Sequence, residues 1–311
     1  MKQLISLLLL IVISAGCSTQ NSNEAEDTLT IYTSIYPIQY FTEKIGGEAV
    51  SVETIYPPGA DAHTFEPTAK TMTTIAKADA FIYLGAGLEG FAGTAADALG
   101  EEDVELVELG KHESLFSESG HDHTHDGHSH ENHDPHIWID PIRAIEMADY
   151  ITEALINIDP DKKEQFKENH KELTENLTAL HQEFENLTNN ATRNKILVSH
   201  AAYGYWEQRY GIEQLSVNGL SPTSDPSQKD LEGIIQKAKK LDMKYMIYEQ
   251  NVSSQVSSII QEELNAKSLT IHNLSVLTEE DIEENEDYMS LMRHNLGVLQ
   301  KALGAEQEGN E

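Results

Sequence analysis

The sequence lacks a second cysteine: Cys17 is the only one among 311 residues. An intramolecular disulfide is therefore excluded, and the chain must obtain its stability from a hydrophobic core. Residues with hydrophobic side chains make up 39% of the sequence. A chain of this length and composition is sufficient for two ordinary domains.

Basic residues are also scarce. The sequence has 21 Lys and Arg against 53 Asp and Glu, which gives a formal net charge of −32. Such a surface repels phosphate backbones and attracts cations, so we expect no nucleic-acid partner. The alternative for most of these charges is that they only maintain solubility.

Long apolar runs are absent except near the N-terminus, at residues 4–13. This run is too short to cross a bilayer as a permanent helix, and the small residues 14–16 separate it from Cys17. The arrangement looks like a bacterial lipobox. We therefore expect residues 1–16 to be a signal peptide, lipid on Cys17 to anchor the protein at the extracytoplasmic face of the cell membrane, and residues 17–28 to form a flexible spacer. The alternative is an ordinary signal peptide followed by an incidental cysteine.

Short β-branched or apolar runs alternate with helical patterns in both halves of the chain. This alternation predicts an α/β fold with mainly parallel sheets in two lobes, residues 29–159 and 191–311. The predicted strands are residues 29–33, 50–55, 80–84 and 104–109 in the first lobe, and 195–198, 214–217, 245–248 and 268–271 in the second. Predicted helices at 228–241 and 254–264 lie between strands of the second lobe.

Glycine and proline are missing from residues 161–189. Within this segment one apolar residue recurs every three, four or seven positions, which predicts a long helix with a single apolar stripe. The stripe consists of Phe166, Leu173, Leu177, Leu180, Phe184 and Leu187. We interpret residues 160–190 as one spine helix that joins the lobes of a monomer. A coiled-coil dimer is the alternative.

A histidine-rich loop is predicted at residues 112–135. Its central part, residues 121–133, contains six histidines mixed with acidic and small polar residues and has no apolar residue from which to build a core. Alternating imidazoles and carboxylates form a loose chelator for Zn²⁺, Cu²⁺ or Ni²⁺. A solvated loop without function is the alternative.

Three further histidines, His63, His136 and His200, stand where predicted strands or loops end. Ligands of open α/β sheets collect beyond the carboxyl ends of the strands. Two lobes that face each other would bring all three imidazoles to one metal ion in the cleft between them.

The segments around these histidines resemble the zinc and manganese branch of the metal-binding ABC-transporter substrate-binding lipoproteins, over essentially residues 29–305. The resemblance is carried by His63-Thr64-Phe65-Glu66-Pro67, Asp134-Pro135-His136-Ile137-Trp138, His200-Ala201-Ala202-Tyr203-Gly204-Tyr205 and Gly219-Leu220-Ser221-Pro222. It implies two α/β lobes joined by one long helix and a Zn²⁺ ion held in the cleft by His63, His136 and His200. It also implies zinc uptake through an ABC permease and its ATPase, without enzymatic activity.

The third protein ligand separates the metals in this family. Zinc binders resemble this chain in having histidine at the His200 position, whereas manganese binders usually present glutamate there. The family carboxylate that completes the site corresponds here to Ser275, whose neutral hydroxyl is a poor zinc ligand. Water, Glu249, His272 or a histidine of the loop remain as the fourth ligand, and we rank water first.

Two other functions remain open. A zinc hydrolase also combines three protein ligands with an open water position, but the sequence contains neither a His-Glu-x-x-His nor a Gly-x-Ser-x-Gly motif. A surface metal buffer or adhesin that works without a transporter is the second alternative.

Overall fold

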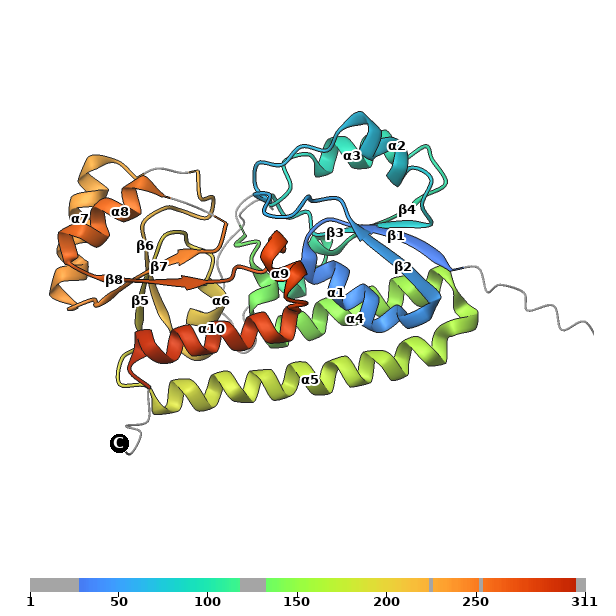
Figure 1. Ribbon diagram of the computed structural model, residues 1–311. Coiled ribbons are helices and arrows are strands. Elements are labelled where there is room, and N and C mark those ends of the chain that lie inside the picture. Colours follow the sequence, from blue (N-terminus) through green and yellow to red (C-terminus); the bar gives the residue numbers. More distant parts are fainter. Residues whose placement is uncertain (1–27, 118–132, 224–225, 252–253, 306–311) are drawn as a thin grey trace, which may run out of the picture.

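The computed structural model describes residues 28–117, 133–223, 226–251 and 254–305 (Figure 1). The predictions for the signal peptide and for Cys17, and most of the histidine-rich segment, lie outside these residues. Within the described part, no helix is long and apolar enough to cross a membrane.

Two four-stranded sheets form the centres of two lobes (Figure 1). The first sheet has the order β2-β1-β3-β4 and the second has the order β6-β5-β7-β8, with every neighbouring pair parallel. Their strands are β1 (Leu29–Thr33), β2 (Val50–Thr54), β3 (Ala80–Tyr83), β4 (Glu105–Glu108), β5 (Lys195–Val198), β6 (Glu213–Ser216), β7 (Tyr245–Glu249) and β8 (Lys267–Ile271). All eight predicted strands are confirmed, and each end lies within one residue of its prediction.

Helices cover both faces of each sheet. In the first lobe α2 and α3 lie above the sheet in Figure 1 and α1 and α4 lie below it. In the second lobe α7 and α8 pack on the outer face, where Leu197, Met246 and Ile260 belong to a separate small core. The helices are α1 (Tyr36–Gly46), α2 (Ala69–Ile75), α3 (Ala92–Leu99), α4 (Pro141–Ile158), α5 (Lys163–Asn190), α6 (Gly204–Tyr210), α7 (Gln228–Lys240), α8 (Gln255–Leu264), α9 (Glu279–Glu283) and α10 (Tyr288–Leu303).

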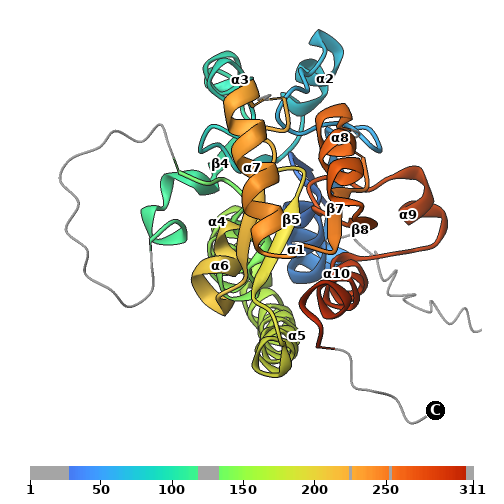
Figure 2. The same ribbon diagram turned by 90° about the vertical axis from the view of Figure 1, so that its left-hand side faces the viewer.

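The long helix α5 runs beneath both lobes, as the apolar stripe predicted (Figure 1). Five of the six stripe residues are buried and Leu187 is half-buried. The helix packs against α1 and α4 of the first lobe and against α10 of the second. Figure 2, viewed along α5, shows α10 beside it. The sequence analysis did not predict α4 or α10, so the spine is broader than the single helix expected.

The lobes also touch directly through residues 273–277, which extend from the second lobe toward the first. The Tyr36 amide donates to the carbonyl oxygen of Ser275 at 2.9 Å, and the Gly59 amide donates to that of Leu277 at 2.9 Å. Trp138 Nε1 donates to the carbonyl of Asn273 at 2.8 Å. These bonds fix the two walls between which the candidate site lies.

Candidate metal centre

The structure brings His63, His136 and His200 together. His200 follows β5 within two residues, His63 lies in the loop after β2, and His136 precedes the short turn that leads into α4. One ring nitrogen of each histidine lies within 4.8 Å of the others, and among the described residues this is the only group of three or more His, Cys, Asp or Glu with such spacing. Residues far apart in sequence thus converge where the two lobes meet.

The spacing of two of these nitrogens suits a tetrahedral metal ion. His63 Nε2 and His136 Nε2 are 3.3 Å apart. Two nitrogens bound at about 2.0–2.1 Å to one tetrahedral Zn²⁺ lie about 3.3–3.4 Å apart. The observed distance is therefore the one that a shared zinc ion requires.

An aspartate two residues earlier positions each of the first two histidines. The His63 amide donates to Asp61 Oδ1 at 2.9 Å, and the His136 amide donates to Asp134 Oδ1 at 3.0 Å. His136 Nδ1 also lies 2.7 Å from Asp134 Oδ1. Because an ionised carboxylate only accepts hydrogen bonds, Nδ1 carries the proton and Nε2 keeps the lone pair that a metal needs.

Glu249, at the end of β7, positions His200 from the neighbouring strand. His200 Nδ1 donates to Glu249 Oε1 at 2.8 Å. Tyr203 donates to the same oxygen at 3.3 Å, and Asn273 Nδ2 donates to Oε2 at 2.9 Å. Oε1 thus orients the imidazole while Asn273 holds Oε2, which is the arrangement of an outer partner rather than of a metal ligand.

His200 differs from His63 in its proton affinity. Its Nε2 donates to the Leu220 carbonyl at 2.8 Å, so both ring nitrogens face acceptors. Burial alone would lower the pKa of His200, but the hydrogen bond and charge of Glu249 outweigh burial and raise it above its usual 6.5. For His63, burial and the neighbouring His136 and His200 lower the pKa to about 3. His63 is thus neutral and His200 is the histidine that must release a proton to bind metal.

The three histidines face a small cavity of about 10 Å³, which is room for about one water-sized occupant. Asp61, Leu88, Trp138, Pro222 and Asn251 also line this cavity. So do Glu249, Asn273 and Ser275, which form a hydrogen-bonded chain in its wall: Ser275 Oγ donates to Asn273 Oδ1 at 2.8 Å.

The remaining candidates for a fourth ligand differ in whether they face the cavity. His272 is turned away from the cavity, because its Nε2 pairs with Asp281 Oδ2 at 3.0 Å and its Nδ1 accepts from the Leu274 amide at 3.0 Å. Ser275 does lie in the cavity wall. His133, the one described histidine of residues 121–133, is exposed and stacks on Phe116 at 5.1 Å between ring centroids.

The segment that carries His136 is held by α6 of the second lobe. Tyr205 Oη donates to the Asp134 carbonyl oxygen at 2.6 Å. Gly204, one residue earlier, leaves room for the Asp134 side chain, since a Cβ there would come within 2.6 Å of Asp134 Oδ2. A side chain at position 204 would therefore disturb the aspartate that orients His136.

Sequence reasoning missed the two orienting aspartates, although a signal for them was present. Asp61 and Asp134 each precede a histidine by two residues, and an aspartate in that place accepts from the histidine's own backbone amide. The outer role of Glu249 and the contact to Leu220 have no such local signal. Both depend on how separate strands and loops pack.

Comparison with known families gives a consistent match. Residues 31–302 match the family described as zinc-uptake complex component A, periplasmic. The zinc-binding lipoprotein AdcA of Streptococcus pneumoniae serotype 4 is 33% identical over 299 residues, covering 94% of this chain and 59% of AdcA. The chain thus spans about three fifths of the length of that relative.

A second relative matches at nearly full length. The high-affinity zinc uptake system protein ZnuA of Bacillus subtilis is 29% identical over 300 residues, covering 95% of this chain and 94% of the relative. Among solved structures, the Zn(II)-bound ZnuA-like domain of S. pneumoniae AdcA superposes with a TM-score of 0.73 at 30% identity, covering 89% of this chain and 99% of that domain.

Proposed function

Since the chain belongs to the family of periplasmic components of zinc-uptake complexes, we propose that it captures Zn²⁺ outside the cytoplasm and delivers it to an ABC permease driven by its ATPase. The observation that carries this proposal is the convergence of three imidazoles within 4.8 Å at the junction of the two lobes. Imidazole nitrogens in this number are typical of zinc sites.

In this proposal His63, His136 and His200 are the zinc ligands. His63 and His136 support it most directly, because their Nε2 atoms already have the spacing of a tetrahedral zinc site. His200 joins them when its Nε2 loses its proton and leaves the Leu220 carbonyl. With Glu249 engaged by His200 and Asn273, and His272 turned away, water is the fourth ligand that we propose.

The size of the cavity supports a binding protein over a zinc hydrolase. Hydrolysis requires room for a substrate beside the metal-bound water. The cavity of about 10 Å³ offers room for about one ion or water molecule. We therefore propose that the protein is not an enzyme and that zinc is its transported cargo.

We propose a location at the extracytoplasmic face of the cell membrane, with lipid on Cys17 as the anchor. The sequence pattern before Cys17 supports this location. A membrane position suits a protein that must pass zinc to a permease.

The function is tested first by binding and then by growth. We expect the purified protein to bind one tight Zn²⁺ in titration calorimetry and to hydrolyse neither ester nor peptide substrates. A cell that lacks the gene is expected to grow poorly in zinc-chelated medium and to recover with added zinc or with the restored gene, but not with a His200→Ala gene. Tight zinc binding without a growth defect would instead indicate a metal buffer or adhesin.

The pH dependence of zinc binding follows from His200. A protonated His200 binds no metal, so the affinity is retained above its pKa, which is raised above 6.5, and is lost as the pH falls through it. His200 releases one proton on binding, so we expect a loss of at least roughly tenfold per pH unit below that pKa. His63, whose pKa is about 3, adds no second proton near neutral pH. Calorimetry across pH 5–9 measures the slope.

Glu249→Gln provides the matched variant for this prediction. Glutamine keeps an oxygen that accepts from His200 Nδ1 but removes the charge that raises the His200 pKa, so the loss of affinity should begin at lower pH. The exposed Glu263→Gln serves as the control for a simple change of net charge. A three-proton slope, or an unchanged pH profile in Glu249→Gln, would contradict the prediction.

A further inference from the structure

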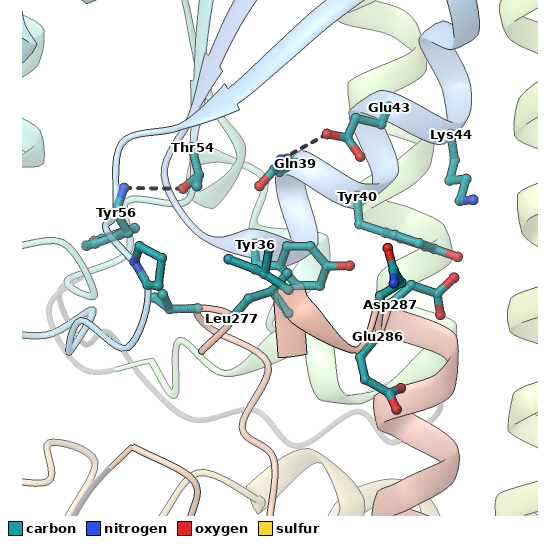
Figure 3. A pocket seen from close by; sticks show the side chains of 14 residues that line it. Tyr36, Gln39, Tyr40, Glu43, Lys44, Thr54, Tyr56, Leu277, Glu286 and Asp287 are labelled. Carbon is teal, nitrogen blue, oxygen red and sulfur yellow. Dashed lines mark hydrogen bonds between the residues drawn. The ribbon is translucent and has the colours of Figure 1, made fainter. Parts of the chain in front are cut away.

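A second and much larger cavity lies at the lobe junction, apart from the histidines. It has a volume of about 510 Å³, which is within the usual range of small-molecule sites. Helix α1 of the first lobe forms one side, and residues 276–287, which include α9, form the other (Figure 3). No residue of the three-histidine cavity lines it.

The two ends of this cavity differ in chemistry. Tyr56 and Leu277 lie at one end in Figure 3, whereas Glu43, Glu286 and Asp287 lie at the other. One end therefore offers apolar surface and the other offers carboxylates. A ligand that fits both ends has an apolar stem and a positively charged head.

Lys44 is the single basic residue in the lining, and its position shows where a positively charged group can bind in this cavity. Its Nζ lies 5.1 Å from the centroid of the Tyr40 ring, within the range of a cation–π interaction. The three carboxylates of the lining outnumber this one ammonium group. The charged end thus retains an excess of negative charge beside an aromatic face.

Tyr40 provides a second polar group for a ligand. Its side chain is only 6% exposed, and its hydroxyl makes no hydrogen bond to any described residue. Burial and the nearby Asp287 carboxylate raise the pKa of Tyr40, so the hydroxyl is a neutral group able to accept a hydrogen bond. The hydroxyl is therefore available to pair with water or with a ligand in the cavity.

We propose that this cavity is a second ligand site, which binds a small organic cation: a primary ammonium group on an aliphatic stem. The stem lies against Tyr36, Tyr56 and Leu277. The ammonium group lies against the Tyr40 ring and the Asp287 carboxylate, where it competes with Lys44. The volume of about 510 Å³ is that of a small-molecule site, so we commit to a free amine as the ligand.

Titration calorimetry with n-hexylammonium chloride on the purified zinc-free protein tests the proposal directly. We expect saturable binding with a dissociation constant in roughly the millimolar range or tighter. Hexan-1-ol and hexanoate have the same stem without the positive charge and are expected to bind at least about tenfold more weakly, because the charged head supplies much of the specificity. Lysine that is acetylated on its α-amino group and amidated at its carboxyl group represents a lysine side chain of a protein. It tests whether the ammonium group comes from a partner protein.

Substitutions in the cavity lining test where n-hexylammonium binds. Asp287→Asn is expected to weaken n-hexylammonium binding about tenfold, while its side-chain oxygen still caps α10 through the Ser290 amide. Tyr40→Leu is expected to weaken binding about fivefold or more by removing the aromatic face, and Lys44→Met to tighten it by removing the competing ammonium. Glu283→Gln, an exposed residue of α9 outside the lining, is the matched charge control and should bind like the unaltered protein.

Three outcomes would overturn the proposal. Equal binding of hexan-1-ol would mean an apolar cavity without preference for a cation. Unchanged binding in both Asp287→Asn and Tyr40→Leu would place the amine elsewhere on the acidic surface. Tighter binding of the lysine derivative than of the free amine would make a partner protein the source of the ammonium. Because the titration uses zinc-free protein, none of these outcomes bears on the zinc function.

Discussion

Alanine in place of His63, His136 or His200 is expected to weaken zinc binding by roughly 10²–10³-fold in each single variant. A protein zinc site has an apparent binding free energy of about 10–16 kcal/mol, so each of three or four ligands accounts for about 3–4 kcal/mol. Alanine leaves a site with too few strong ligands, and no described neighbour replaces the lost nitrogen, because Glu249 and His272 are engaged elsewhere. Competition with a chelator of known zinc affinity measures each constant.

The control for this series is His170→Ala. His170 lies on α5 and pairs with Asp149 at 3.0 Å, away from the three-histidine cavity. Its replacement is expected to leave zinc affinity unchanged while removing the same number of atoms. If two of the three cavity variants kept the affinity of the unaltered protein, the ligand assignment would be wrong.

The second large effect concerns the choice of metal. Three imidazoles and no carboxylate ligand favour Zn²⁺ over Mn²⁺, which stands at the weak end of the divalent series and prefers oxygen ligands. We expect a margin of at least about a hundredfold in affinity. Displacement of bound Zn²⁺ by increasing Mn²⁺ measures this margin, and equal competition at similar concentrations would reject the zinc assignment.

Ser275 offers a way to alter that margin. It lies in the wall of the histidine cavity, and the family resemblance predicts a carboxylate at this position. Ser275→Glu is expected to reduce the preference for Zn²⁺ over Mn²⁺ by adding an anionic oxygen, whereas Ser275→Ala should change zinc affinity little if water is the fourth ligand. A large loss of zinc affinity in Ser275→Ala would make the hydroxyl itself a ligand.

Local patterns in the sequence were sufficient for most of the secondary structure. The parallel strands are short runs with apolar or β-branched residues between turn residues, so their ends could be placed within one residue. The spine helix α5 was equally predictable, because its stripe repeats over many turns without glycine or proline. Helix α4 was missed although Asp140 caps it and Pro141 begins it, both recognisable signals.

The sequence by itself determined the α/β class, the spine helix and the identity of His63, His136 and His200 as a candidate zinc site. Each of these follows from spacing along the chain or from motifs beside the histidines. Only the tertiary structure decided that Glu249 orients His200 and that the Leu220 carbonyl oxygen accepts a hydrogen bond from His200 Nε2. It also decided that the amphipathic cavity with Tyr40 and Asp287 exists. These contacts join residues about 20 to 250 positions apart, and such pairings are set by the packing of the two lobes, for which no local pattern carries information.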